Sequence, residues 1–330
     1  MISFIIIGRN EGWKFTKCLQ SVFETIEYNK LKDAEVIYVD SKSTDDSLKR
    51  AKAYKQVKVF LITGECNAAI ARNIGAKESK GGILYFIDGD MEIEKDFLSH
   101  AIINNQLKYD CITGHLDDYL YDINDNFLGV KKRTYKDEIP KVEQKLNTNG
   151  GIFLIKKQIW DELGGMRTKY RRSQDIDLSL RIIEKKYKTI RLPSLITKHH
   201  TVEYSNDKRM WKNLKQLHSF YPAMIFRDHL LNTVVWSRVL RSNYTTVLFL
   251  ILIISLLINN NWLILFPAIL YFLFFVAKVA KNTIDASISK NKILYFFERI
   301  VFQFSHDLLF WFGFFFFHPK SKKLNYTLID

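Results

Sequence analysis

Residues 81–92 read GGILYFIDGDME, and this stretch decides the fold of the first half of the chain. Residues 83–87 are all apolar, with aromatic and β-branched members, which predicts a buried strand. The strand ends in Asp88-Gly89-Asp90, where two carboxylates one residue apart can face one hard cation such as Mn²⁺ or Mg²⁺. Such a cation would in turn hold a diphosphate. A polar turn is the competing interpretation, because Asp and Gly both favour turns.

The sequence around this stretch alternates between predicted strands and helices. Apolar runs at residues 2–7, 35–39 and 57–62 predict three more strands, and residues 13–26 and 67–79 have helical spacing. This alternation is typical of an α/β fold with a parallel sheet, in which ligands bind beyond the carboxyl ends of the strands. Those ends carry Asn10-Glu11, Asp40 and Asp88-Gly89-Asp90. The sequence therefore predicts a site at this edge of the sheet.

A second acidic pair begins another predicted helix further along the chain. Asp175 and Asp177 stand in its first turn. They either complement the helix dipole, with Asp177 pairing with Arg181, or supply a catalytic base at the mouth of the site. His199 and His200 end a pair of short extended pieces and offer an imidazole ligand to a metal.

The patterning between these motifs is weaker. Residues 96–107 are predicted to form a helix, and residues 108–143 have no clear assignment. Residues 152–155 predict a strand, and residues 157–163 predict a short helix that stops at Gly164-Gly165. The three cysteines show no paired spacing, so we expect reduced thiols without a special role.

Composition narrows the class of partner. The 330-residue chain carries 49 Lys and Arg against 35 Asp and Glu, a formal charge of +14. Such an excess is typical of proteins that bind nucleic acid, anionic membranes or phosphorylated substrates. Aromatic residues make up 14% of the chain and many lie in its last third, which favours a membrane over nucleic acid. Neither GxGxxG nor GxxxxGK[ST] occurs, so dinucleotide and Walker sites have no support.

Five motifs, in this order, resemble the family 2 glycosyltransferases, whose GT-A fold is α/β with a Rossmann-like, mainly parallel sheet. The motifs are SFIIIGRNE, VDSKSTDDS, ARNIGA followed by GGILYFIDGD, GGIFLIKKQIWDELGGM and SQDIDLSLR. The resemblance implies that residues 1–203 form a catalytic domain that transfers a sugar from a nucleotide-sugar donor, usually with inversion at the anomeric carbon.

The resemblance also implies roles for single residues. Asp88 and Asp90 match the DxD motif that holds Mn²⁺ or Mg²⁺ on the donor diphosphate, and Asp175 matches the catalytic base. His199 falls where many members place a further metal or phosphate contact. The donor-binding positions of the family are matched by Asn10, Glu11, Asp40, Arg72 and Asp88.

Three positions depart from the family pattern. Ser41 and Lys42 stand where many members have Asp and Gly in the turn that contacts the nucleotide base, and Gln174 stands where Glu usually precedes the catalytic base. We expect a uridine diphosphate sugar as donor. Asp175 would take the proton from an acceptor hydroxyl as that oxygen attacks the anomeric carbon. The metal would neutralise charge on the departing diphosphate.

The last third of the chain changes to apolar and basic segments. Residues 204–243 predict basic amphipathic helices beside a membrane, residues 244–280 a transmembrane hairpin around an Asn turn, and residues 281–330 an amphipathic segment in the membrane interface. Lys and Arg flank both ends of the hairpin and are absent from its Asn turn, so both ends should face the cytosol.

The sequence thus predicts a membrane-anchored glycosyltransferase of the bacterial type at the plasma membrane, transferring a hexosyl or N-acetylhexosaminyl group. Its acceptor would be a membrane lipid or a polyprenyl-linked glycan in surface glycan assembly, with no nucleic acid as partner. A polyprenyl-phosphate sugar synthase is an alternative enzyme. A catalytically inactive scaffold that binds nucleotide or lipid is an alternative of another class, and the joint presence of Asp88, Asp90 and Asp175 argues against it.

Overall fold

The structure of the chain, a computed structural model, describes residues 1–203, 206–258, 261–286 and 291–329. The chain forms two compact units, each described here by itself. The N-terminal unit comprises Met1–Glu203 together with Lys320–Asp330, and the helical unit comprises Tyr204–Pro319.

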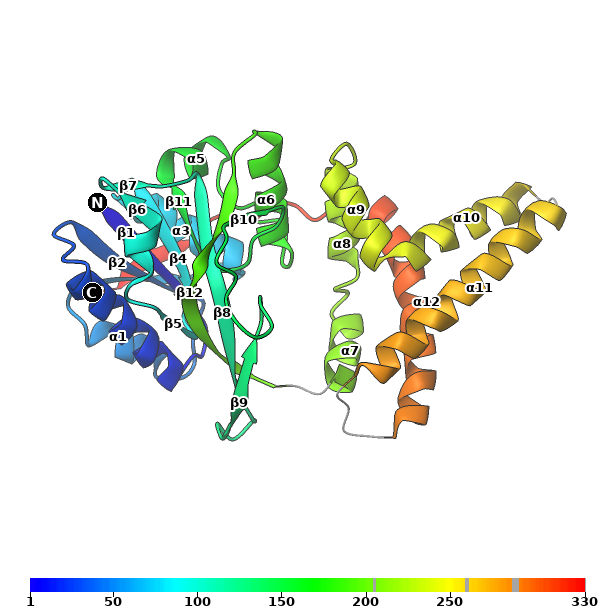
Figure 1. Ribbon diagram of the computed structural model, residues 1–330, viewed down its shortest axis with the longest axis horizontal. Coiled ribbons are helices and arrows are strands. Elements are labelled where there is room, and N and C mark those ends of the chain that lie inside the picture. The colour runs from blue at the N-terminus through cyan, green and yellow to red at the C-terminus, as the bar shows by residue number, and fades with distance from the viewer. Residues whose placement is uncertain (204–205, 259–260, 287–290, 330) are drawn as a thin grey trace. The chain divides into compact units, whose positions relative to one another are not determined.

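The N-terminal unit is built around a sheet whose central strands are parallel. They lie in the order β4-β1-β2-β3 (Figure 1) and span β1 (Ile2–Gly8), β2 (Ala34–Asp40), β3 (Val57–Ile62) and β4 (Ile83–Asp88). Helices cover both faces of these strands, which explains why each strand reads as an apolar run. Ile7 lies beside Asp88 and Gly8 beside Asp40, so β1, β2 and β4 end at one edge. The predicted α/β class with a mainly parallel central sheet is confirmed.

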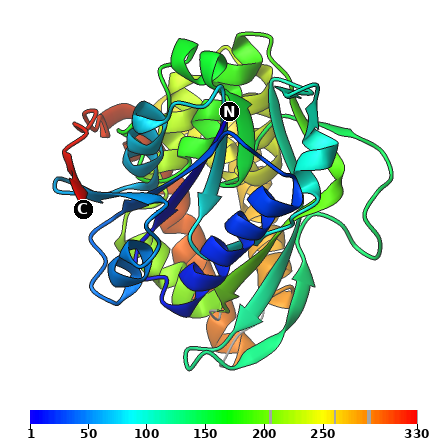
Figure 2. The ribbon, with the colours of Figure 1, turned by 90° about the vertical axis from the view of Figure 1, so that its left-hand side faces the viewer.

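The helices pack on the two faces in separate groups. One face carries α1 (Trp13–Tyr28) and α2 (Ser47–Lys52), and α1 crosses the front of Figure 2; the other face carries α3 (Ala68–Glu78), α5 (Lys157–Glu162) and α6 (Gln174–Glu184). α3 lies very close to β1, because a Cβ built on Gly75 would be only 2.2 Å from Cγ2 of Ile5. This close approach holds the first turn of α3 at the edge where the strands end.

The rest of the sheet is mostly antiparallel and lies in the region that sequence patterning left weakest. Its strands are β5 (Met91–Ile93), β8 (Cys111–Tyr121), β9 (Phe127–Lys132), β10 (Gln144–Leu146), β11 (Phe153–Lys156) and β12 (Thr189–Val202). β11 runs antiparallel to β4, and β12 pairs with both β8 and β5. β12 is one long strand where the sequence indicated two short pieces. Pairing with β8 on both sides of Pro193 keeps β12 extended, although proline interrupts the apolar pattern of the sequence there.

Residues 96–107 do not form the single helix that the sequence predicts. α4 spans only Phe97–Ala101, and a hairpin of β6 (Ile102–Ile103) and β7 (Gln106–Leu107) follows it. Asn104 and Asn105 form the turn with φ of 51° and 61°. Asn tolerates this left-handed conformation better than most residues, and two in succession favour a two-residue hairpin turn. The prediction of a single helix was therefore wrong, because it extended the apolar spacing of residues 96–107 through the turn at Asn104 and Asn105.

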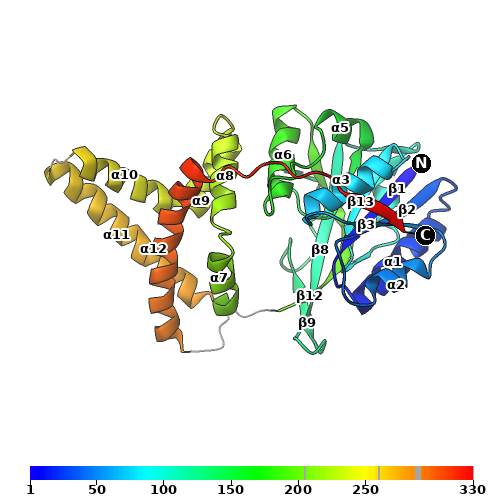
Figure 3. The same cartoon turned by 180° about the vertical axis from the view of Figure 1, so that it is seen from behind.

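The last residues of the chain return to the sheet of the N-terminal unit. β13 (Tyr326–Ile329) pairs antiparallel with β3, and the red C-terminal segment lies at this edge in Figure 2 and Figure 3. The approach is held at Lys322, whose backbone N–H donates to Thr168 Oγ1 (2.7 Å). The sequence grouped these residues with the interfacial segment 281–330, because a four-residue edge strand has too little pattern to be seen alone.

Every described element of residues 204–319 is a helix. The helices are α7 (Asn206–Lys215), α8 (Phe220–Asp228), α9 (Thr233–Ser242), α10 (Tyr244–Ile258), α11 (Asn261–Ile284) and α12 (Lys292–Phe316). α10 and α11 run side by side as a hairpin (Figure 1). By length and composition, residues 264–284 are the single described helix that could cross a membrane alone, and α9 with α10 pass only as a pair bent by 89°. Asn259 and Asn260 of the predicted turn lie outside the described residues.

A buried carboxylate joins the three long helices of this unit. Asp307 of α12 is fully buried. Its Oδ1 accepts hydrogen bonds from Thr245 Oγ1 of α10 (3.0 Å) and from Gln303 Nε2 (2.9 Å), and its Oδ2 accepts one from the Tyr271 hydroxyl of α11 (3.3 Å). These donors explain how an acidic side chain is accommodated among apolar helices.

Candidate active site

A cavity of about 320 Å³ opens where β1 and β4 end. The β1–α1 loop, the β2–α2 loop and the first residues of α3 complete its wall. Four of its lining residues, among others, come from the predicted site or its base-binding turn: Glu11, Ser41, Asp88 and Asp90. The edge of the sheet that the sequence singled out therefore carries a cavity with the volume of a small-ligand site.

Three carboxylates meet in this cavity. Burial raises the pKa of Glu11 to about 8, and the charge of Asp90 adds to the effect. Burial also raises the pKa of Asp88, against the opposing charge of Arg72. Both pKa shifts have burial as their largest cause, and repulsion between the neighbouring carboxylates adds to it. The cavity is thus built to receive positive charge.

Arg72 of α3 reaches under the strand ends to hold Asp88. Its Nη2 lies 2.5 Å from Asp88 Oδ1 and donates to the Gly151 carbonyl oxygen at 3.1 Å. Arg72 is 3% exposed, so the ion pair is shielded from water on the arginine side. Arg72 therefore acts through Asp88 and is not among the residues that line the cavity.

Gly151 is required by this contact. A Cβ at Gly151 would lie 2.5 Å from Asp88 Oδ2 and 2.9 Å from Arg72 Nη2. We expect Gly151→Ala to destabilise the full chain by about 1–3 kcal/mol, because a methyl group forced between packed groups must displace them. Gly150→Ala is the matched control, since its Cβ would meet nothing within 4 Å. Denaturant unfolding followed by tryptophan fluorescence measures both, and equal midpoints for the two variants would contradict the account.

His199 lies opposite Asp90 and is held from behind by Asp118. Its Nε2 is 3.2 Å from Asp90 Oδ2, and its Nδ1 is 2.7 Å from Asp118 Oδ1. Burial disfavours charge on the ring, but the hydrogen bonds to Asp118 and Asp90 outweigh burial and raise the pKa of His199 to about 9. Arg133 Nε donates in turn to Asp118 Oδ2 at 3.0 Å. Pairing of β12 with β8 places His199 directly beside Asp118.

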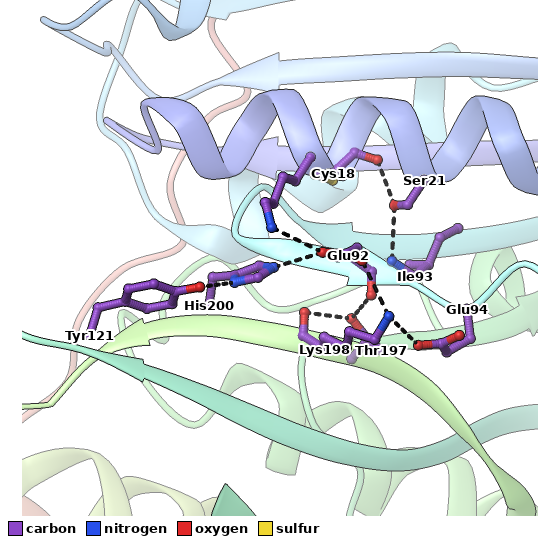
Figure 4. A network of polar contacts seen from close by, with 10 residues as sticks. Cys18, Ser21, Glu92, Ile93, Glu94, Tyr121, Thr197, Lys198 and His200 are labelled. Atoms are coloured by element: carbon purple, nitrogen blue, oxygen red, sulfur yellow. Dashed lines mark hydrogen bonds and ion pairs between the residues drawn. The ribbon is translucent and has the colours of Figure 1, made fainter. Parts of the chain in front are cut away.

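His200 points into a separate network, which Figure 4 shows. Its Nε2 bonds to Glu92 Oε2 (3.0 Å) and its Nδ1 to the Tyr121 hydroxyl (3.0 Å). Lys198 adds an ion pair to Glu94 at 3.1 Å. These contacts fasten β5 to β12, so they fix the distance between Asp90 and His199 on the same two segments. Of the two histidines, His199 is the one that contacts the site.

Asp40 and Asn10 organise the two loops that border the cavity. Asp40 is fully buried, and its two carboxylate oxygens accept from the Tyr38 hydroxyl (2.8 Å) and the Ser43 N–H (2.8 Å). Asn10, with φ of 59°, accepts from the Thr44 N–H at 2.7 Å. Both residues thus shape the turn that contains Ser41, and Ser41 is the residue of that turn that lines the cavity.

The second acidic pair divides into two different environments. Asp177 is fully buried and ion-paired to Arg167 (3.0 Å) and Arg181 (2.8 Å), as the i,i+4 spacing predicted. Asp175 is half-buried at the start of α6 and forms no ion pair with any described residue. Its charge adds to the raised pKa of Asp88, and it is not among the residues that line the cavity. The pairing interpretation fits Asp177, and the catalytic interpretation remains for Asp175.

Sequence reasoning missed Asp118, Arg133 and Gly151. Asp118 sits in the run GHLDDY, where strand alternation would place it and Asp117 on opposite faces, but the strand itself was not assigned. Within the described part of the chain, no three His, Cys, Asp or Glu side chains gather closely enough to enclose a metal by themselves.

Comparison with known proteins agrees with this architecture. A family model described as "Glycosyl transferase family 2" matches residues 3–173, which is 171 of 330 residues. "Glycosyltransferase AglE" from Haloferax volcanii is 32% identical over 105 residues, which is 31% of this chain and 34% of that protein. The chain thus matches only about a third of that relative's length.

Solved structures give a weaker likeness. Crystal structures of S. aureus TarS 1-349, alone and in complex with UDP-GlcNAc, both align with a TM-score of 0.47. They are 17% and 18% identical to this chain, and cover 60% and 63% of it and 60% of each TarS chain. The family model covers more than half of the chain, and the chain therefore belongs to glycosyltransferase family 2.

Proposed function

We propose that this protein is a metal-dependent, inverting glycosyltransferase that moves a sugar from a uridine diphosphate sugar to a polyprenyl-linked acceptor held at the membrane. The observation that carries the proposal is the cavity at the strand ends, where Glu11, Asp88 and Asp90 converge. A nucleotide-sugar diphosphate is anionic, and among the described residues that line the cavity Arg9 is the one basic side chain, so a divalent cation would offset the repulsion from these three carboxylates. The site therefore fits a donor that binds together with a divalent metal or to a metal already in the cavity.

Asp90 and His199 fit such a metal. Asp90 Oδ2 and His199 Nε2 lie 3.2 Å apart, near the separation of about 3 Å between adjacent ligands of an octahedral ion bound at about 2.1 Å. Carboxylate and imidazole both suit Mn²⁺. When bound, the metal supplies neutralisation of charge on the leaving diphosphate.

Asp175 is the residue we assign to proton removal. Its carboxylate forms no ion pair with a described residue, and it lies in the first turn of α6, where its charge helps to raise the pKa of Asp88. An acceptor hydroxyl that hydrogen-bonds to this carboxylate would lose its proton there as its oxygen attacks the anomeric carbon.

Asp118 would orient His199 for metal binding. Its hydrogen bond to Nδ1 would hold the ring so that Nε2, which contacts Asp90 Oδ2, could coordinate the metal after losing its proton. We expect Asp118→Asn to weaken Mn²⁺ binding about 10- to 100-fold, as is typical for loss of a carboxylate behind a ligating histidine. Asp117→Asn is the matched control, because Asp117 accepts from the Tyr135 hydroxyl instead. Mn²⁺ titration followed by electron paramagnetic resonance gives both affinities, and an equal affinity for the two variants would remove Asp118 from this role.

The path of the chain supports a two-crossing membrane anchor. Residues 1–203 and β13 belong to one sheet, so the segment between them must leave and re-enter the same compartment. Any membrane crossings between them are therefore even in number, and the α10–α11 hairpin would supply two, with residues 264–284 as the stronger span. We propose that the catalytic domain faces the cytosol and α12 stays in the interface. A reporter enzyme fused after residue 330 should be active only in the cytosol, and activity outside would contradict this topology.

Transfer of label tests the function itself. Membranes that carry the full chain are supplied with labelled uridine diphosphate sugars and Mn²⁺, and label is followed into organic-extractable material. We expect label in a lipid-linked product, and mild acid should release from that lipid a labelled glycan of more than one sugar. A product that releases the single labelled sugar would indicate a sugar phosphate, and hence the polyprenyl-phosphate synthase. Nucleotide binding without transfer to any lipid fraction would favour the scaffold.

A further inference from the structure

The helical unit contains a second cavity, of about 270 Å³, with an arginine on its wall. It lies among α7, the end of α11 and the start of α12. Its polar lining residues are Asn213, Asn282, Asp285, Tyr295 and Arg299. All of them belong to residues 204–319, so this cavity is distinct from the one at the strand ends.

Arg299 carries a positive charge that the described residues leave unneutralised. Its guanidinium stacks on the Phe302 ring at 5.1 Å and bonds to Tyr295, and no described carboxylate lies within ion-pair distance. Its Nε is buried and has no hydrogen-bond partner in the described part of the chain. A partly desolvated guanidinium without a counter-ion is unfavourable, and a bound anion would remove that cost.

The other lining groups suit a phosphate. Asn282 is half-buried on the cavity wall, its amide forms no hydrogen bond with a described residue, and the amide can donate to an anionic oxygen. Asp285 also lines the cavity, but it is exposed and forms no ion pair with a described residue. Guanidinium groups bind phosphate oxygens in a two-pronged geometry that lysine cannot match.

Exposed apolar side chains lie on two of the helices that contribute to the cavity. Ile284, Leu294 and Phe297, on the helices that form the cavity, are all exposed. Ile284 is also the last residue of the strongest candidate membrane span, residues 264–284. A ligand with a phosphate and a hydrocarbon chain would satisfy the guanidinium and cover the apolar surface together.

We infer that this cavity binds the phosphate of an anionic lipid, with Arg299 and Asn282 as its main contacts. The inference rests on the proposed function for the identity of that lipid, the polyprenyl phosphate or diphosphate that carries the acceptor. The cavity provides recognition of the lipid end of the acceptor, whereas the carboxylates of the first cavity handle the donor.

Lipid binding by the full chain in detergent tests the inference without any sugar donor. Native mass spectrometry measures retention of a polyprenyl monophosphate, of the matching polyprenol, and of the monophosphate in competition with inorganic phosphate. We expect Arg299→Gln to lower retention of the monophosphate by about 10- to 100-fold, the usual effect of losing a charged hydrogen-bonding partner. Asn282→Ala should lower it several-fold, and the exposed Arg241→Gln should leave it unchanged.

Three results would overturn the inference. Equal retention by Arg299→Gln in a chain with unaltered thermal unfolding would place the lipid elsewhere. Equal retention of the polyprenol would show that no phosphate is recognised, and displacement of the lipid by an equimolar amount of inorganic phosphate would show a simple anion site. Arg299→Lys, which keeps the charge, should recover part of the affinity if folding is intact. Because this experiment measures no sugar transfer, its failure would leave the proposed glycosyltransferase activity untouched. Equally, a failure of the transfer experiment would leave the lipid-binding result untouched.

Discussion

Asp175→Asn should lower the turnover number of the full chain about 10³-fold, within the 10²- to 10⁴-fold range of general-base catalysis. Asn has the same shape but cannot accept the acceptor's proton. The KM for the donor should change little, because Asp175 does not line the donor cavity and forms no described ion pair. A loss confined to turnover would therefore separate proton removal from donor binding.

The control for this variant is Asp161→Asn, an exposed carboxylate on the neighbouring helix α5. Initial rates at several concentrations of donor and acceptor give both kinetic constants. If Asp175→Asn retains wild-type turnover, the acceptor oxygen arrives already ionised, as a lipid phosphate does, and Asp175 is not the base. A rise in donor KM alone would instead assign Asp175 to binding.

Asp90→Asn should lower transfer by about 10²- to 10⁴-fold, the rate equivalent of several kcal/mol of metal-derived charge stabilisation. The amide keeps one neutral oxygen but loses the charge that faces His199 Nε2 at 3.2 Å. Raising the Mn²⁺ concentration should recover part of the activity, because the diphosphate still offers ligands. This partial rescue distinguishes a metal ligand from a residue that only maintains the fold.

Asp96→Asn provides the matched control, since Asp96 is exposed and forms no side-chain cap on α4. Transfer and Mn²⁺ binding are measured on the same preparations. Wild-type dependence on Mn²⁺ in Asp90→Asn would mean that the metal is held elsewhere. Equal losses in Asp90→Asn and Asp96→Asn would point to a general defect in the enzyme.

The predictable parts of the fold are those that leave a pattern among residues close in sequence, such as an apolar run or an i,i+4 pair. β1, β2, β3 and β4 are buried on both faces, so each leaves a continuous apolar run in the sequence. Their polar ends stand out against these runs, which is why Glu11, Asp88 and Asp90 could be placed at one edge before the structure. The i,i+4 pair of Asp177 and Arg181 was visible for the same local reason.

The parts that were missed depend on pairings between distant segments. Asp118 meets His199 only because β8 pairs with β12, 81 positions away. Gly151 is required by its approach to Arg72 and Asp88, which no local pattern records. β13 pairs with β3, although the residues of the helical unit separate the two strands in the sequence. Periodicity cannot report such contacts, so neither Asp118 and Gly151 nor the β13–β3 pairing could be assigned from the sequence.

The measurement that tests the central claim most directly is the anomeric configuration of the product. The purified full chain is given an α-linked uridine diphosphate sugar, Mn²⁺ and a polyprenyl-linked acceptor, and the new linkage is determined by nuclear magnetic resonance. A single displacement assisted by Asp175 at a metal-bound donor predicts a β linkage, formed only while the metal is present. An α linkage, or a product formed at an unchanged rate after chelation of the metal, would contradict the account.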